Sequence, residues 1–193
     1  MVRDRLSEKE FTIRATMVVN ATGPWVDEIR SINQSRHGKQ LHLTKGVHIV
    51  VPFHRLPVRQ AIYFDVPDGR MIFAIPRGRV TYIGTTDTDY QGDKDRVLAT
   101  REDALYILNA VNETFPSALL TLADIESSWA GLRPLIHEEG KSASELSRKD
   151  EIFESASGLI SIAGGKLTGY RKMAERVVDR VIELAFNDRA LSP

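Results

Sequence analysis

The chain has 193 residues, 42% hydrophobic and 27% charged, the composition of a soluble globular protein with room for one domain or parts of two. Its 26 lysine and arginine residues match its 26 aspartate and glutamate residues, so net charge gives no reason to expect a nucleic-acid partner. The lack of cysteine excludes disulfides, zinc fingers and thiol catalysis. We find no apolar run that could span a bilayer and no signal peptide, and we therefore expect a soluble protein of intracellular type.

The N-terminal segment predicts a strand, a tight turn and a helix. Residues 11–19 alternate apolar and polar side chains and then become wholly apolar, which is typical of a strand that is buried at its end. The turn follows at residues 20–25, where Pro24 suits the first turn of a helix. Asp27 and Glu28 then favour the positive end of that helix. This order of elements is typical of nucleotide-binding α/β domains.

The central region, from about residue 40 to 160, predicts an antiparallel sheet. Its strands are expected at residues 41–51, 61–66, 70–75, 79–84 and 125–132. Asp68 and Gly69 supply a turn between the second and third of these strands, so we expect a hairpin from about Ala61 to Ile75. Thr100, with an acidic residue three positions later, resembles the N-cap of a helix that covers the sheet.

The C-terminal region predicts a second hairpin and a long helix. The hairpin joins residues 151–154 to 159–162 through a short Ser/Gly turn, and apolar residues at helical spacing run from 173 to 185. Both ends of the chain therefore predict α/β structure around an antiparallel centre. A substrate domain inserted into a nucleotide-binding domain explains this order.

Each candidate motif has a structural explanation when it is considered alone. Residues 20–25 suit an ordinary strand-to-helix turn, and residues 164–168 suit either a plain helix start or an anion or cofactor site. Arg133 is compatible with a surface arginine, and His48 with a structural histidine in a strand. Residues 84–87 suit a turn. No metal-ligand spacing and no Ser/His/Asp order stands out.

The motifs are specific as an ordered set. They are VNATGPW at 19–25, TKGVHIVVP at 44–52, IGTTD at 83–87, GLRPL at 131–135 and GGKLTGYRK at 164–172. Together they resemble the FAD-dependent glycerol-3-phosphate dehydrogenase family over about residues 11–184. One departure is Gly169, where many relatives have a second threonine.

The resemblance implies an amino-acid-oxidase-like architecture, which combines α/β and α+β parts. FAD would lie across a Rossmann-like domain, and the antiparallel sheet of an inserted substrate domain would cover the flavin ring. In this sequence we expect residues 1–38 and 157–187 to form part of the FAD-binding domain and residues 39–156 the substrate domain, with 188–193 as a tail.

The resemblance also implies two groups of cofactor-binding residues. The first group, in the turn after the N-terminal strand, is Ala21, Thr22, Gly23 and Trp25. The second group, at a helix start facing the pyrimidine edge of the flavin, is Gly165, Lys166, Leu167 and Thr168. The positive end of a helix suits the negative charge that builds on reduced flavin.

Three residues are implied for catalysis and for binding glycerol 3-phosphate. Arg133 offers a planar fork to the phosphate oxygens, and Lys166 offers a point charge. His48 is the candidate base for the C2 hydroxyl proton, because the ordinary pKa of histidine lies near neutrality. Thr85, Thr86 and Asp87 are candidates for orienting His48 or the ribityl chain, a set that we describe as residues 85–87.

The sequence contains no G-x-G-x-x-G motif, on which this fold binds the FAD pyrophosphate. We therefore expect a portion of a longer enzyme that holds FAD weakly by itself. The resemblance implies a quinone or oxygen as electron acceptor and a cytoplasmic protein, peripheral at the inner face of the cell membrane. It leaves a homodimer open. The alternatives are the substrate domain of another FAD oxidase, of the glycerophosphate type or of the amino-acid type, whose arginine binds a carboxylate, and a non-catalytic ligand-binding module.

Overall fold

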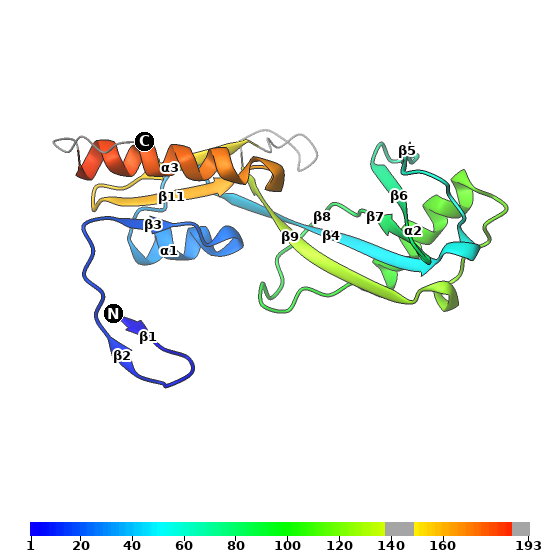
Figure 1. Cartoon of the computed structure of the whole chain (residues 1–193), viewed down its shortest axis with the longest axis horizontal. Helices are drawn as coiled ribbons and strands as arrows, with labels where there is room; N and C mark the ends of the chain where they lie inside the picture. The colour runs from blue at the N-terminus through cyan, green and yellow to red at the C-terminus, as the bar shows by residue number, and fades with distance from the viewer. Residues whose placement is uncertain (138–148, 187–193) are drawn as a thin grey trace. The chain divides into compact units, whose positions relative to one another are not determined.

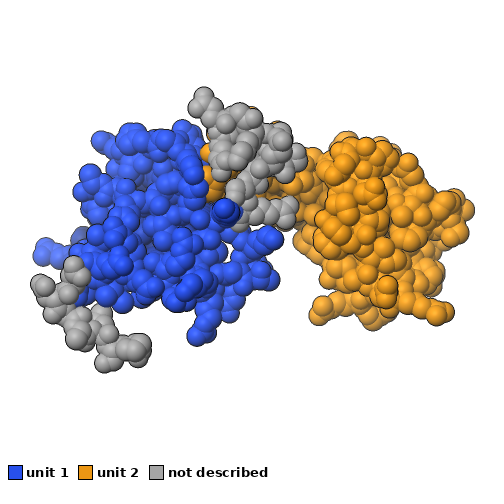
Figure 2. Space-filling model, turned by 90° about the horizontal axis from the view of Figure 1, so that it is seen from above, with its two compact units in different colours: residues 1–41, 148–193 blue, residues 42–147 orange. Residues whose placement is uncertain are grey.

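The computed structural model describes residues 1–137 and 149–186, which divide into two units (Figure 2). Within the described residues, unit 1 comprises 1–41 and 149–186, and unit 2 comprises 42–137. The second segment of unit 1 begins before residue 150, not at the expected residue 157, because the strand at 150–154 pairs with the sheet of unit 1. The expected tail at 188–193 lies outside the described residues.

Unit 1 is built on a three-stranded sheet in the order β10–β11–β3. Its elements are β1 (Val2–Arg3), β2 (Glu10–Phe11), β3 (Val18–Asn20), η1 (Gly23–Trp25), α1 (Val26–Ile32), β10 (Asp150–Glu154), β11 (Leu159–Gly164), η5 (Leu167–Gly169) and α3 (Tyr170–Ala185). β11 runs antiparallel to β10 and parallel to β3, and β1 and β2 form a separate hairpin (Figure 1). The predicted hairpin at 151–162 and the C-terminal helix are therefore confirmed.

The long N-terminal strand expected at residues 11–19 is wrong in two respects. Only Val18–Asn20 forms β3, and the side chains of Val18 and Val19 are 56% and 43% exposed where burial was expected. The reason is that β3 is an edge strand, which pairs only with β11 among the described residues.

Two ion pairs join helix α3 to β10. Arg176 pairs with Asp150, and Arg180 donates to Glu154 at 2.6 Å. Val177 is the one buried residue of the helix. Within the described residues, no helix combines the length and the apolar character needed to cross a membrane.

Unit 2 is a sheet in the order β5–β6–β7–β4–β8, with β9 also paired to β4. Its elements are β4 (Leu41–Pro52), η2 (Phe53–Arg55), β5 (Ile62–Asp65), β6 (Met71–Arg77), β7 (Val80–Gly84), β8 (Thr88–Asp89), α2 (Arg101–Thr114), η3 (Leu122–Asp124) and β9 (Ser127–Ile136). β5 and β6 pair antiparallel around a turn, so the predicted hairpin is confirmed.

The two faces of this sheet differ because successive side chains of a strand point to opposite sides. One face packs with α2 into a core that includes Val47, Ile49, Ile72, Ile83 and Ile107. On the other face, register partners form a row across four strands: Tyr63 pairs with Phe73, Phe73 with Gly84, and Gly84 with His48. The candidate base therefore lies on the face turned away from the core.

A buried ion pair fixes α2 to β4. Thr100 caps the helix, as its sequence predicts, and the Asp103 carboxylate accepts a hydrogen bond from the Thr100 backbone N–H at 2.8 Å. The ammonium group of Lys45 donates to Asp103 at 2.5 Å, and the two side chains are only 10% and 7% exposed. Burial alone would raise the pKa of Asp103, but hydrogen bonds from Lys45 and Thr100 hold that pKa below its ordinary value.

Replacing Lys45 by alanine should lower the free energy of unfolding by about 3 kcal/mol, because it leaves the buried Asp103 carboxylate without its cation. Adding Asp103→Asn removes the uncompensated charge and should recover part of that loss. Urea denaturation of the parent, the single variant and the double variant measures both effects. Equal stability of parent and Lys45→Ala would show that the pair does not hold α2 on the sheet.

Candidate functional site

Arg133 is fixed by the segment that follows β7. Its Nη2 donates to the hydroxyl oxygen of Thr85 at 2.9 Å, and its Nη1 donates to the backbone carbonyl of Thr86 at 3.2 Å. The carboxylate of Asp87 lies 3.4 Å from the same Nη1. These contacts from three consecutive residues hold the guanidinium in one orientation.

Thr86 also fixes this segment to β4. Its buried hydroxyl accepts from the backbone N–H of Val47 at 3.0 Å and donates to the carbonyl of Lys45 at 3.2 Å. Residues 85–87 therefore contact Arg133 and the backbone of β4, whereas none of their described hydrogen bonds goes to His48.

Two glycines make room for the charged and titratable side chains of unit 2. A Cβ atom placed on Gly46 would lie 2.4 Å from Nη2 of Arg133 and 2.6 Å from its Cζ. A Cβ atom placed on Gly84 would lie 2.4 Å from Cδ2 of His48. Such separations are far below van der Waals contact, so a side chain at either position would displace the functional group.

The imidazole of His48 also stacks on an indole. The ring centres of His48 and Trp129 are 4.8 Å apart, and the ring planes differ by 7°. Among residues 1–137 and 149–186, no hydrogen-bond partner reaches the buried Nδ1 of His48. Burial, and then the positive charge of Arg133, lower the pKa of His48 below its ordinary value. The lowered pKa favours the neutral form of His48 at pH 7.

The structure thus brings together three of the sequence motifs, at residues 44–52, 83–87 and 131–135. Sequence reasoning missed Trp129, which stands four residues before Arg133 in β9. Positions 129 and 133 have the same parity in a strand, and this is the signal that could have placed both side chains on one face.

In unit 1, the two groups of predicted cofactor residues follow neighbouring parallel strands. Asn20 at the end of β3 is the register partner of Ser161, and β11 continues to Gly164. The turns at 21–25 and 165–168 therefore leave the sheet at the same edge, the carboxyl ends of the strands, where open α/β sheets bind their ligands. Ala21, Thr22, Lys166, Leu167 and Thr168 are exposed there.

Hydrogen bonds of the buried Asn20 side chain fix the first of these turns. Its buried amide donates to the carbonyl of Val26 at 3.0 Å and to the hydroxyl of Ser161 at 3.1 Å. The hydroxyl of Thr22 in turn donates to the Asn20 carbonyl oxygen at 2.7 Å. One side chain thus connects β3, the turn, the start of α1 and β11.

The second turn requires glycine at position 165. Gly165 has a φ of +83°, and a Cβ atom there would lie 2.5 Å from the sulfur of Met173. The 3₁₀ turn η5 follows, and α3 begins at Tyr170, three residues earlier than the apolar periodicity indicates. The turn therefore presents exposed backbone and Lys166 ahead of a helix, which fits a negatively charged group of a cofactor.

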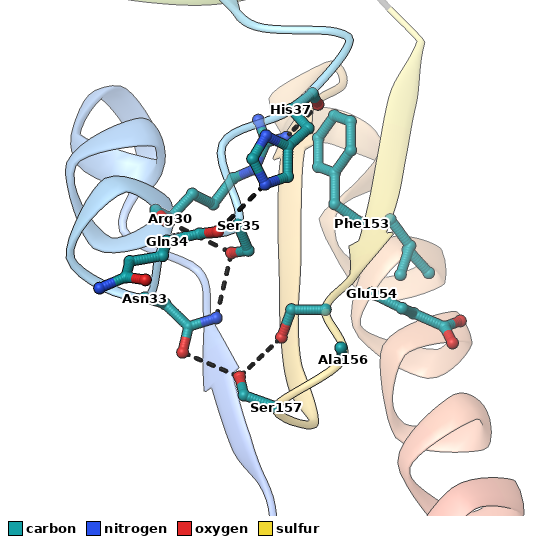
Figure 3. Close-up of a pocket in the computed structure, with 11 residues that line it drawn as sticks. Arg30, Asn33, Gln34, Ser35, His37, Phe153, Glu154, Ala156 and Ser157 are labelled. Carbon is teal, nitrogen blue, oxygen red and sulfur yellow. Dashed lines mark hydrogen bonds between the residues drawn. The ribbon is translucent and has the colours of Figure 1, made fainter.

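A hollow of about 650 Å³ in unit 1 lies between the segment after α1 and the β10–β11 turn (Figure 3). Arg30 lines it, but its guanidinium donates to Asp27 at 2.7 Å and lies 4.1 Å from the ring centre of Phe153. The hydroxyl of Ser157 donates to Asn33 at 2.8 Å (Figure 3). These contacts tie α1 to the β10–β11 hairpin, so we assign Arg30 a structural role.

The comparisons with known proteins point to one family. A family model described as "FAD dependent oxidoreductase" (DAO) matches residues 2–171. The "Aerobic glycerol-3-phosphate dehydrogenase" of Bacillus subtilis (strain 168) is 58% identical over 181 residues, which are 94% of this chain and 33% of that protein. The protein of the same name from Staphylococcus aureus (strain USA300) is 55% identical over 192 residues, which are 99% of this chain and 34% of that protein.

Solved structures agree with these matches. The glycerol-3-phosphate dehydrogenase of Bacillus halodurans, complexed with FAD, superposes with a TM-score of 0.84 at 60% identity, and the match covers 94% of this chain and 34% of that one. The amino acid oxidase NikD, at 13% identity, shares the fold with a TM-score of 0.59 over 92% of this chain and 46% of its own, which confirms the predicted amino-acid-oxidase-like architecture. The chain spans about a third of the length of the glycerol-3-phosphate dehydrogenases that it matches. Because the family match extends over residues 2–171, the chain belongs to the FAD-dependent oxidoreductase family.

Proposed function

We propose that this chain forms part of an FAD-dependent dehydrogenase that oxidises sn-glycerol 3-phosphate to dihydroxyacetone phosphate. The observation that carries the proposal is the pairing, on one sheet of unit 2, of a rigidly held arginine fork with a neutral histidine. The identity of 58–60% to glycerol-3-phosphate dehydrogenases over 94% of the chain supports this substrate over the carboxylates of other flavin oxidases.

The cofactor side of the reaction belongs to unit 1 in this proposal. Bound FAD would supply the acceptor for the hydride that leaves C2 of the substrate. The residues that would hold it are Ala21, Thr22, Gly23, Trp25, Gly165, Lys166, Leu167 and Thr168. Their fit to the cofactor is supported by two exposed turns at the carboxyl ends of parallel strands and by the glycine conformation at Gly165. Lys166 is also proposed as an additional cation for the phosphate group of glycerol 3-phosphate.

Residues of unit 2 are proposed to accept the proton and to bind the phosphate of the substrate. His48 is proposed to take the C2 hydroxyl proton, for which it must start neutral, and its lowered pKa supports that state at physiological pH. Arg133 is proposed to bind the phosphate, because a guanidinium matches phosphate oxygens in a planar, bidentate geometry. Residues 85–87 hold that guanidinium, so little conformational entropy is lost when the phosphate binds.

The partners and the location of the whole protein stay predictions from the resemblance. They are a quinone or oxygen as electron acceptor, a homodimer, and a cytoplasmic protein peripheral at the inner face of the cell membrane.

A protein of the relatives' length that contains this chain should be yellow when it is purified with FAD. Anaerobic addition of sn-glycerol 3-phosphate should bleach its absorption near the flavin maximum, whereas addition of an amino acid should not. A flavin that stays oxidised with glycerol 3-phosphate but is bleached by an amino acid would identify an amino-acid oxidase. A protein without any flavin would favour a ligand-binding module.

Arg133→Ala in the same protein should lower kcat/KM for glycerol 3-phosphate by at least about tenfold, because a hydrogen bond to a charged group is worth about 1.5–3 kcal/mol. Arg133→Lys keeps the charge and loses the planar fork, so its kcat/KM should lie between those of Arg133→Ala and the parent. With unphosphorylated glycerol as substrate, Arg133→Ala should lower kcat/KM less, because the phosphate contact is missing in both proteins. Equal losses for both substrates would assign Arg133 to the chemistry or the fold and not to the phosphate.

A matched pair of glycine variants tests the same contact without removing the arginine. Gly46→Ala places a methyl group where the guanidinium lies and should also lower kcat/KM by about tenfold. Gly131→Ala, on the same strand as Arg133, meets no atom within 4 Å and should leave kcat/KM near the parent value. Equal activities of the two variants would contradict the proposed position of the guanidinium.

A further inference from the structure

We infer that Trp129 and Gly84 form a slot for His48, which sets the orientation of the imidazole and keeps water from part of it. Trp129 is then a positioning residue for proton transfer, which it serves through His48 without bonding to the substrate. This inference rests on the proposed role of His48 as the base.

The geometry of the slot comes from two different strands. Gly84 on β7 is the register partner of His48, and its missing side chain leaves the space into which the imidazole leans. Trp129 on β9 lies parallel to the same ring at a centre-to-centre distance of 4.8 Å. A ring confined in this way keeps one orientation, as a general base must.

The exposure of Trp129 shows that the indole is not held by a core. The residue is 46% exposed, and the ring partners of its indole among the described residues are His48 and Tyr82, whose ring centre is 5.8 Å away. The shortest of its ring contacts among the described residues is the parallel stack on His48, so the two rings constrain each other's orientation.

The slot also affects the pKa of His48. Among the described residues, the charge of Arg133 on β9 acts on His48, Asp87 beyond β7 contacts Arg133, and Tyr82 on β7 lies beside the indole. Burial is the larger cause of the lowered pKa of His48, and the positive charge of Arg133 is the smaller one. The indole of Trp129 supplies part of that burial. Removing the indole admits water and should raise this pKa, while Arg133 continues to oppose protonation.

The pH dependence of kcat/KM in the FAD-loaded, full-length protein tests the inference. A base must be deprotonated, so activity falls as pH drops through its pKa. In Trp129→Ala, the acid limb should move up by about half a pH unit or more, so that activity falls more at pH 6 than at pH 8. Trp129→Phe retains an aromatic stack and should restore the parent profile. An unchanged acid limb in Trp129→Ala overturns the inference.

Nuclear magnetic resonance of His48 gives a readout that does not depend on turnover. Its titration midpoint, assigned by comparison with His48→Asn, should rise in Trp129→Ala and stay near the parent value in Trp129→Phe. A midpoint that stays constant in both variants contradicts the slot. If the midpoint rises but glycerol 3-phosphate never bleaches the flavin, the slot stands and the proposed function fails.

Gly84→Ala provides an independent test if Trp129→Ala does not fold. The added methyl group would occupy the place of the imidazole, so the high-pH plateau of kcat/KM should fall by at least about tenfold while the flavin content stays constant. Gly131→Ala is the control, because it adds a methyl group to open space. A parent-like plateau in Gly84→Ala overturns the inference.

Discussion

The absence of a side chain at two positions, Gly46 and Gly84, is the constraint on which the candidate site of unit 2 depends. Arg133 and His48 each occupy the place that a Cβ atom would take at one of these glycines. Both side chains can therefore approach the backbone of the sheet closely. Residues 85–87 then hold the guanidinium, and Trp129 stacks on the imidazole. The glycines are needed for the space above them, and neither has a positive φ.

The rigidity of this arrangement comes from the opposite face of the same sheet. There β4 alternates buried residues, such as Val47 and Ile49, into the core under α2, while His48 between them points the other way. The buried pair of Lys45 and Asp103 fixes the helix to the strand that carries both Gly46 and His48. A packed core on one side thus holds the polar groups on the other side in place, as a preorganised site requires.

Local patterns in the sequence were enough to predict the β5–β6 hairpin and the Thr100 cap, because a turn and a cap involve residues close in the chain. The contact of Gly84 with His48 depends on strand register over a long sequence separation, which no local pattern shows. The predicted burial of Val18 failed for the same reason, since burial of a strand depends on its neighbours in the sheet. The family resemblance assigned residues 85–87 to His48 or the ribityl chain, so their contact with Arg133 was predicted neither from local patterns nor from the resemblance, and the same holds for the position of Trp129.

The central claim is that Arg133 and His48 act on the two ends of one small phosphorylated substrate. A crystal structure of the FAD-loaded, full-length protein with dihydroxyacetone phosphate tests it most directly. The account predicts phosphate oxygens about 3 Å from the guanidinium nitrogens of Arg133 and the ketone oxygen about 3 Å from a ring nitrogen of His48. A phosphate bound away from Arg133 would contradict it.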